Sequence, residues 1–122
     1  MKMEFKKGDI LWGTHQAIKH PIIFYEERNS AHFEGFMLTH SNIGHNIPFT
    51  QEFIKTVVEG IDEPFQYDNT YIVDAILEKK QYWAPFYKIG ELTDAGIAFI
   101  EKIREGKKGI SWKEYVQRQR NE

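Results

Sequence analysis

Short apolar segments separated by polar turns make up roughly the first ninety residues. Their large side chains are mostly β-branched or aromatic, which is typical of strands. The segments read DILWG, PIIFYEE, HFEGFMLTH, TYIVDAILE and YWAPFYKIG. Between them, ERNSAH, SNIGHN and IDEPFQYDN supply the Asn, Asp, Gly, Ser and Pro that turns require. The pattern therefore predicts a β region over residues 1–90.

The segment TQEFIKTVVEG carries signals for two conformations. Thr50 is a suitable N-cap and Gly60 a suitable helix stop, which favours a helix. The β-branched triplet Thr-Val-Val lowers helix propensity in the same segment. We expect a short helix here.

A helical period replaces the short strands after residue 91. In ELTDAGIAFIEKIREG, Thr93 is a good N-cap, and Leu92 can pack against Ile97 one turn further on. Isoleucines recur at helical spacing on one face until Gly106, a residue type that often ends helices. This segment predicts a helix over residues 94–105.

A second helix is predicted at the end of the chain, where Ser111 and Glu114 form a capping box in ISWKEYVQRQR. The whole pattern is that of a mainly β, α+β protein. With 122 residues the chain suits one hydrophobic core. We therefore expect one domain over residues 1–122, with a β part at 1–90 and a helical part at 91–122.

Composition excludes several classes of protein. The chain is 41% hydrophobic and 15% aromatic, which excludes a disordered chain, and it has no cysteine for disulfides or zinc. No segment has the length and apolarity of a signal peptide or a membrane span, so we expect a cytoplasmic protein. A net charge of −2 argues against generic binding to duplex DNA. From Glu101 onward, seven Lys or Arg against four Glu suit either a phosphate contact or a solvated helix face.

All five histidines lie between residues 15 and 45, in or beside two predicted loops. Cleavage of RNA by its own 2′-hydroxyl needs a base for that proton, an acid for the leaving oxygen, and donors to the phosphate. His15, His20, Thr39 and His40 could supply these groups. A histidine near a strand end also commonly makes one structural hydrogen bond, and that alternative stays open.

A metal site is a second interpretation of the histidines. The pairs His15–His20 and His40–His45 each have four intervening residues, a spacing found in zinc sites. Residues i and i+5 of a strand point to opposite faces, which weakens this interpretation. We expect no metal and no cofactor.

Aromatic side chains are numerous in the β region, and two or three of them could stack on unpaired bases. The segment QYWAPFYK is the best candidate, because its proline interrupts a strand and exposes neighbouring rings. Most of the others are expected to fill the core. The set comprises Trp12, Phe24, Tyr25, Phe33, Phe36, Tyr71, Tyr82, Trp83, Phe86 and Tyr87.

Four segments, in order over residues 4–104, resemble the MazF/PemK (CcdB-like) toxin superfamily. They read FKKGDILWG, HQAIKHPIIFYEE, FMLTHS and DNTYIVDAILEKKQYWAPFYKIGELTDAGIAFIEKI. The resemblance implies a small SH3-like barrel that closes with a C-terminal helix and cuts single-stranded RNA. It further implies a homodimer and an antitoxin protein as partner.

Carried over by position, the family's catalytic arginine falls on His20, its threonine on Thr39, and an acidic residue on Asp74. A histidine can exchange protons near neutral pH, which an arginine cannot do. The family's Arg-Thr pair after the acidic strand is replaced by Leu77 and Glu78. The residues expected to bind substrate are His15, Gln16, Lys19, His40 and Ser41.

The leading hypothesis is a metal-independent endoribonuclease that cleaves single-stranded RNA by acid-base catalysis. The alternative is a noncatalytic SH3-like module that binds RNA or a protein or peptide partner, because the family arginine is replaced. Neither hypothesis involves a membrane.

Overall fold

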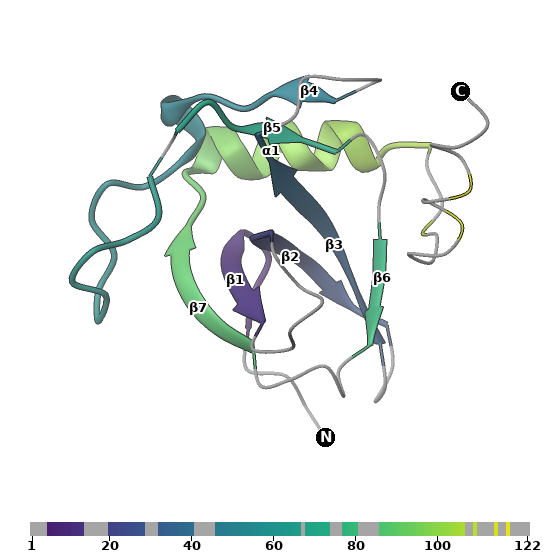
Figure 1. The fold of residues 1–122 in the computed structure, drawn as a ribbon, viewed down its shortest axis with the longest axis horizontal. Coiled ribbons are helices and arrows are strands. Elements are labelled where there is room, and N and C mark those ends of the chain that lie inside the picture. Colours follow the sequence, from purple (N-terminus) through teal and green to yellow (C-terminus); the bar gives the residue numbers. More distant parts are fainter. Residues whose placement is uncertain are drawn as a thin grey trace.

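The computed structural model describes residues 5–13, 20–28, 32–40, 46–66, 68–73, 77–80, 86–106 and the single positions 109, 114 and 117. Over these residues the protein is mainly β, as predicted (Figure 1). The strands are β1 (Asp9–Gly13), β2 (Ile22–Glu27), β3 (His32–Thr39), β4 (Ile47–Pro48), β5 (Tyr71–Ile72), β6 (Leu77–Lys80) and β7 (Phe86–Glu91). A 3-10 helix, η1 (Gln51–Phe53), and an α-helix, α1 (Asp94–Arg104), complete the described elements.

Each predicted apolar segment contains a strand. TYIVDAILE is divided between β5 and β6, and residues 74–76 between these strands lie outside the described residues. The short strand β4 was not predicted, because Ile47 and Pro48 follow a loop-like sequence and pair over only two residues.

The sheet is antiparallel, in the order β4-β5-β3-β2-β1-β7, with β6 also beside β3. β3 is the central strand. It pairs with β2 along one edge, while its other edge pairs first with β6 and then, at Leu38 and Thr39, with β5. Among the described residues no ladder joins β7 to β4 or β6, so the sheet is open.

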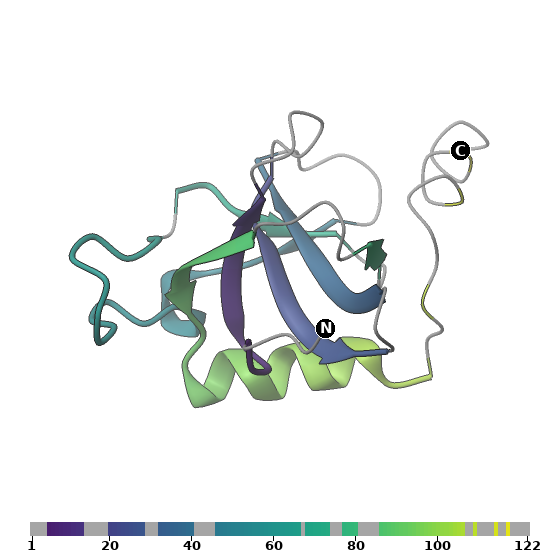
Figure 2. The same cartoon turned by 90° about the horizontal axis from the view of Figure 1, so that it is seen from below.

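The central strands are buried on both faces, which explains their nearly continuous apolar sequences. One face packs with α1, which lies along one side of the curved strands (Figure 2). Its buried residues are Ile10, Ile23, Phe36, Leu38, Phe49, Ile54, Ile72, Leu92, Ile100 and Ile103. The opposite face buries Leu11, Ile22, Phe24, Phe33 and Phe86.

α1 begins and ends close to the predicted limits. The Thr93 hydroxyl accepts a hydrogen bond from Gly96 N at 3.2 Å, as an N-cap should, and donates to the Glu52 carbonyl oxygen at 2.8 Å. The second bond ties the helix to η1. Gly106 follows α1 with φ of +74°, a conformation that favours glycine. No helix in the described part of the chain is long and apolar enough to span a membrane.

The helix expected in TQEFIKTVVEG is wrong beyond its first turn. Only Gln51–Phe53 is helical, and Ile54 is extended, with φ of −120° and ψ of 127°. The Thr50 hydroxyl bonds to the Glu52 carboxylate and does not cap a backbone N–H. The β-branched Thr-Val-Val triplet outweighs the terminal signals, and Gly60, at φ of +82°, belongs to a tight turn. The predicted second helix falls largely outside the described residues.

Candidate functional site

Three of the predicted site residues lie in the described part of the chain. His20 directly precedes β2, Thr39 ends β3, and His40 follows it. His15, Gln16, Lys19, Ser41 and Asp74 lie outside the described residues. The site is therefore built from the ends of β2 and β3.

The register between β2 and β3, continued past the end of β2, aligns His20 with Thr39. Ile22 pairs with Met37, and Leu38 N donates a hydrogen bond to the Pro21 carbonyl oxygen at 2.9 Å. That bond continues the same register by one pair beyond β2. Continued by one more residue, this register aligns His20 with Thr39, and residues aligned in this way have side chains on the same face of a sheet.

The same line of residues continues across the next two strands. Thr39 pairs with Tyr71 in β5, and Tyr71 pairs with Pro48 in β4. We call His20, Thr39, Tyr71 and Pro48 the cross-strand row. Its members are partly exposed or, for Pro48, exposed.

The cross-strand row lies on the sheet face that points away from α1. Alternation along the strands decides this, because successive side chains point to opposite faces. The neighbours Leu38 and Ile72 belong to the core that packs with α1, and Ile47 is packed against it. The row therefore combines accessible polar side chains with a backbone fixed by the core on the other face.

His40 is exposed just beyond Thr39. Its Nδ1 lies 3.4 Å from the carbonyl oxygen of Asn69, a residue with φ of +46° in the turn before β5. A carbonyl oxygen can only accept, so a hydrogen bond here uses the tautomer that carries its proton on Nδ1 and leaves Nε2 as the acceptor of the neutral ring.

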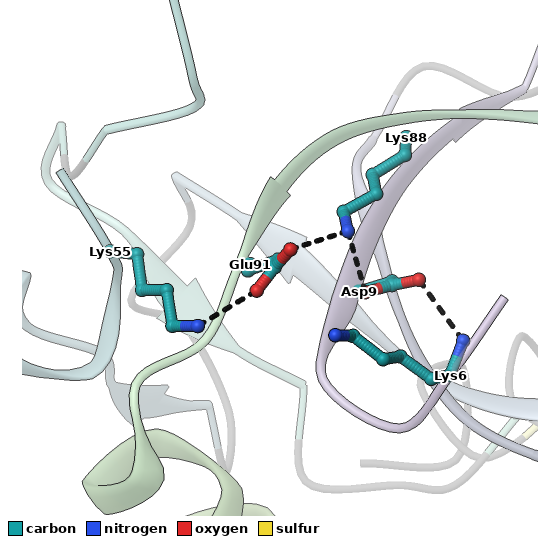
Figure 3. A network of polar contacts seen from close by, with 5 residues as sticks. All are labelled: Lys6, Asp9, Lys55, Lys88 and Glu91. Atoms are coloured by element: carbon teal, nitrogen blue, oxygen red, sulfur yellow. Dashed lines mark hydrogen bonds and ion pairs between the residues drawn. The ribbon is translucent and has the colours of Figure 1, made fainter. Parts of the chain in front are cut away.

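A network of charges joins β1, β7 and the segment after η1 (Figure 3). Lys88 Nζ lies 2.5 Å from Glu91 Oε2 and 3.3 Å from Asp9 Oδ1. Glu91 Oε1 accepts from Lys55 Nζ at 2.9 Å, and Asp9 Oδ2 accepts from the backbone N of Lys6 at 3.0 Å. Asp9 is buried, with 2% of its surface exposed.

The contacts in this network set the ionisation of Glu91 and Lys88. Hydrogen bonds from Lys55 and then Lys88 lower the pKa of Glu91 from 4.5 to about 2, although burial acts in the opposite direction. Burial lowers the pKa of Lys88, but the Glu91 hydrogen bond and the Asp9 charge together raise it above 10.5. Both groups stay charged near neutral pH. The network therefore suits a structural role better than proton transfer.

A second set of charges surrounds Glu34 in β3. Glu34 is fully buried. Its Oε2 lies 3.4 Å from an Arg28 guanidinium nitrogen, and its Oε1 lies 3.4 Å from Nε of Arg104. Beside it, an open depression of about 630 Å³ lies between Tyr25 and the C-terminal end of α1. Charges of both signs line this depression, so it does not indicate one class of ligand.

No group of three or more His, Asp or Glu residues that could hold a metal ion occurs within the described ranges. Two of the four histidines in the metal interpretation, His15 and His45, lie outside them. That interpretation therefore stays untested as a four-histidine site.

Comparison of the chain with protein-family models, with curated proteins and with solved structures gives no match.

Tyr71 is the residue of this row that sequence reasoning did not single out. It stood among ten candidate aromatics, and QYWAPFYK was preferred. Most of that segment, residues 81–85, lies outside the described residues. The usable signal was the position of Tyr71 at the start of a strand, one residue after the turn residues Asp68 and Asn69.

Proposed function

We propose that this protein is a MazF/PemK-like endoribonuclease that cleaves single-stranded RNA without a metal ion. The observation that carries the proposal is the β2–β3 register, which aligns His20 with Thr39 when it is continued one residue past Pro21 and Leu38. These are two of the three positions on which the resemblance places catalytic groups, and the third is Asp74.

The strand pairing supports the finer proposal of an SH3-like barrel. β3 pairs along one edge with two successive strands, β6 and then β5. Strands of small barrels, which tilt and curve as the sheet closes, are often paired in this way. The outer edge of β7 is also occupied, because Lys55 N and Phe65 N donate to the Glu91 and Ile89 carbonyl oxygens.

The proposed reaction uses the substrate's own 2′-hydroxyl. The neutral imidazole of His20 takes the 2′-hydroxyl proton, and the 2′ oxygen attacks the adjacent phosphorus. The bond from phosphorus to the 5′ oxygen breaks, that oxygen takes a proton from water, and His20 returns its proton to the solvent. The products are a 2′,3′-cyclic phosphate and a 5′-hydroxyl.

Other groups stabilise this transition state. The Thr39 hydroxyl can donate a hydrogen bond to a nonbridging phosphate oxygen, where negative charge increases during attack. His40, held by Asn69, can contact the RNA with Nε2. In the proposal, Asp74 is the further acid-base group, and Lys19 binds the phosphate.

Substitution of His20 tests the catalytic role. Positioned acid-base catalysis contributes about 100- to 10,000-fold, so His20→Ala should slow cleavage of single-stranded RNA by about that factor. Cleavage by the wild type should depend on a group that titrates at about 6 to 7. His20→Arg, which restores the family residue, should keep substantial activity and lose this pH dependence.

Thr39→Val is the companion variant, because it keeps the β-branched shape and removes the donor. This variant should cleave RNA about 100- to 1,000-fold more slowly than the wild type, which is the usual effect of removing one hydrogen-bond donor to a developing oxyanion. If every variant, including the wild type, binds RNA without cutting it, the noncatalytic module is the correct function.

The same proposal includes a homodimer and an antitoxin protein as partner, both from the resemblance. Sedimentation at high micromolar concentration should give the mass of two chains. A monomer under these conditions would remove the dimer from the proposal without affecting the cleavage test.

A further inference from the structure

We propose that Tyr71, with Pro48 beside it, forms a stacking subsite for an unpaired base next to the phosphate held at His20 and Thr39. This inference rests on the proposed function, because it names how the same site binds its RNA. It begins from the cross-strand row, in which Tyr71 directly follows Thr39.

Strand spacing places the subsite beside the reacting phosphate. Neighbouring strands lie about 4.8 Å apart, and paired side chains have Cβ atoms about 5 Å apart. A phosphate held at Thr39 therefore has the Tyr71 ring one strand away on the same face. That separation suits a base attached to the nucleotide at the cleaved bond.

Tyr71 is partly exposed. The next residue, Ile72, is completely buried in the core that packs with α1. The ring stacks on no other aromatic ring within the described ranges. Pro48, its partner in β4, is exposed and extends the apolar surface towards the edge of the sheet.

The backbone beneath the ring is firmly held. The carbonyl oxygen of buried Thr70 accepts from Phe49 N at 2.9 Å, and the Thr70 hydroxyl accepts from Asp68 N at 3.2 Å. These bonds fix the start of β5 against β4. A ring on so fixed a strand loses little freedom when a base stacks on it.

The chemistry of the subsite selects unpaired nucleotides. A tyrosine ring stacks on any base, because every base has a π-face, but a base inside a duplex is already stacked. The subsite therefore favours single-stranded RNA over duplex without reading one particular base.

Binding of an uncleavable RNA tests the subsite separately from catalysis. A single-stranded 2′-O-methyl RNA should bind Tyr71→Leu about 5- to 150-fold more weakly than the wild type, as loss of one stacked base predicts. Tyr71→Phe should bind within about threefold of the wild type, because it keeps the ring. The control is Val57→Ala, which shortens an exposed apolar side chain in the segment after η1 and should leave binding within about threefold of the wild type.

Salt dependence distinguishes stacking from a phosphate contact. The slope of log affinity against log salt should be the same for Tyr71→Leu and the wild type, because no counterion-releasing contact is lost. Equal binding by Tyr71→Leu and the wild type would overturn the subsite. Equal losses in Tyr71→Phe and Tyr71→Leu would also overturn it, because the hydroxyl would then be responsible.

Photocrosslinking of the wild-type protein covers the case in which Tyr71→Leu does not fold. An RNA carrying 5-iodouridine should crosslink to the peptide that contains Tyr71, as identified by mass spectrometry. A crosslink to residues 81–88 instead, or no RNA binding at all, would overturn the proposal. If RNA stacks on Tyr71 but is not cleaved, the ribonuclease function is wrong and the stacking subsite is confirmed.

Discussion

Neutralising Glu91 should destabilise the protein by an amount that depends on pH. Its carboxylate lies between Lys88 and Lys55, and its pKa falls from 4.5 to about 2 in the folded protein (Figure 3). At about 1.4 kcal/mol per pH unit, this difference corresponds to at most about 3.5 kcal/mol. The Glu91 side chain is 13% exposed, but that of Lys55 is 44% exposed and partly screened. We therefore expect Glu91→Gln to cost about 1–2 kcal/mol at pH 7.

The sign of the pH dependence follows from the lowered pKa. The stabilisation from charged Glu91 is complete above pH 4.5 and disappears as the pH falls through about 2. Urea unfolding of the wild type and Glu91→Gln at pH 7, 4.5, 3 and 2 should give free energies of unfolding that converge over this window.

Glu101→Gln is the matched control. Glu101 also contacts a lysine, Lys7, but at 3.9 Å and with its side chain 52% exposed. This variant should lie within about 0.5 kcal/mol of the wild type at every pH. Two results would refute the ion pairs of Glu91 as the cause. One is a loss of unfolding free energy in Glu91→Gln no larger than in Glu101→Gln. The other is a difference between Glu91→Gln and the wild type that stays constant from pH 7 to pH 2.

Two further stability predictions concern α1. Gly96→Ala should destabilise the protein by about 1–3 kcal/mol despite the better helix propensity of alanine, because its Cβ would lie 2.4 Å from the Phe53 carbonyl oxygen; a raised melting temperature would contradict this contact. Thr93→Ala should lose about 1–2 kcal/mol in denaturant unfolding, because one hydroxyl both caps Gly96 N and bonds to the Glu52 carbonyl. Thr93→Ser should retain most of that stability.

Local sequence signals account for the elements that were predicted correctly. β1 matches DILWG, and α1 starts after the predicted cap Thr93, because strand periodicity and capping depend on a few neighbouring residues. The helix predicted from Thr50 and Gly60 was wrong because its middle residues prefer extended conformations. Terminal signals alone did not decide that segment.

Long-range contacts explain what the sequence did not predict. In HFEGFMLT, a charged residue such as Glu34 would be expected at an exposed strand position. It is buried instead, because Arg104 in α1, 70 residues away, forms an ion pair with its carboxylate. The Asp9–Lys88 pair likewise joins two strands that are distant in sequence. No local pattern contains this information.

The candidate site divides in the same way. The resemblance placed catalytic groups on His20 and Thr39, but only the β2–β3 register makes them neighbours, and a bulge near Phe24 makes that register hard to predict. Tyr71 joined the site through its pairing with Thr39. Asp74 remains a prediction from the sequence.

Dependence of cleavage on the substrate's 2′-hydroxyl tests the central claim most directly. The wild type and a His20→Ala/Thr39→Val double variant, purified in parallel, are incubated with one single-stranded RNA in the presence of EDTA. We predict that the wild type alone cuts the RNA, leaves a 2′,3′-cyclic phosphate, and fails to cut the same strand when it is 2′-O-methylated. Equal cleavage by the double variant, cleavage of the methylated strand, or no cleavage by the wild type would contradict the claim.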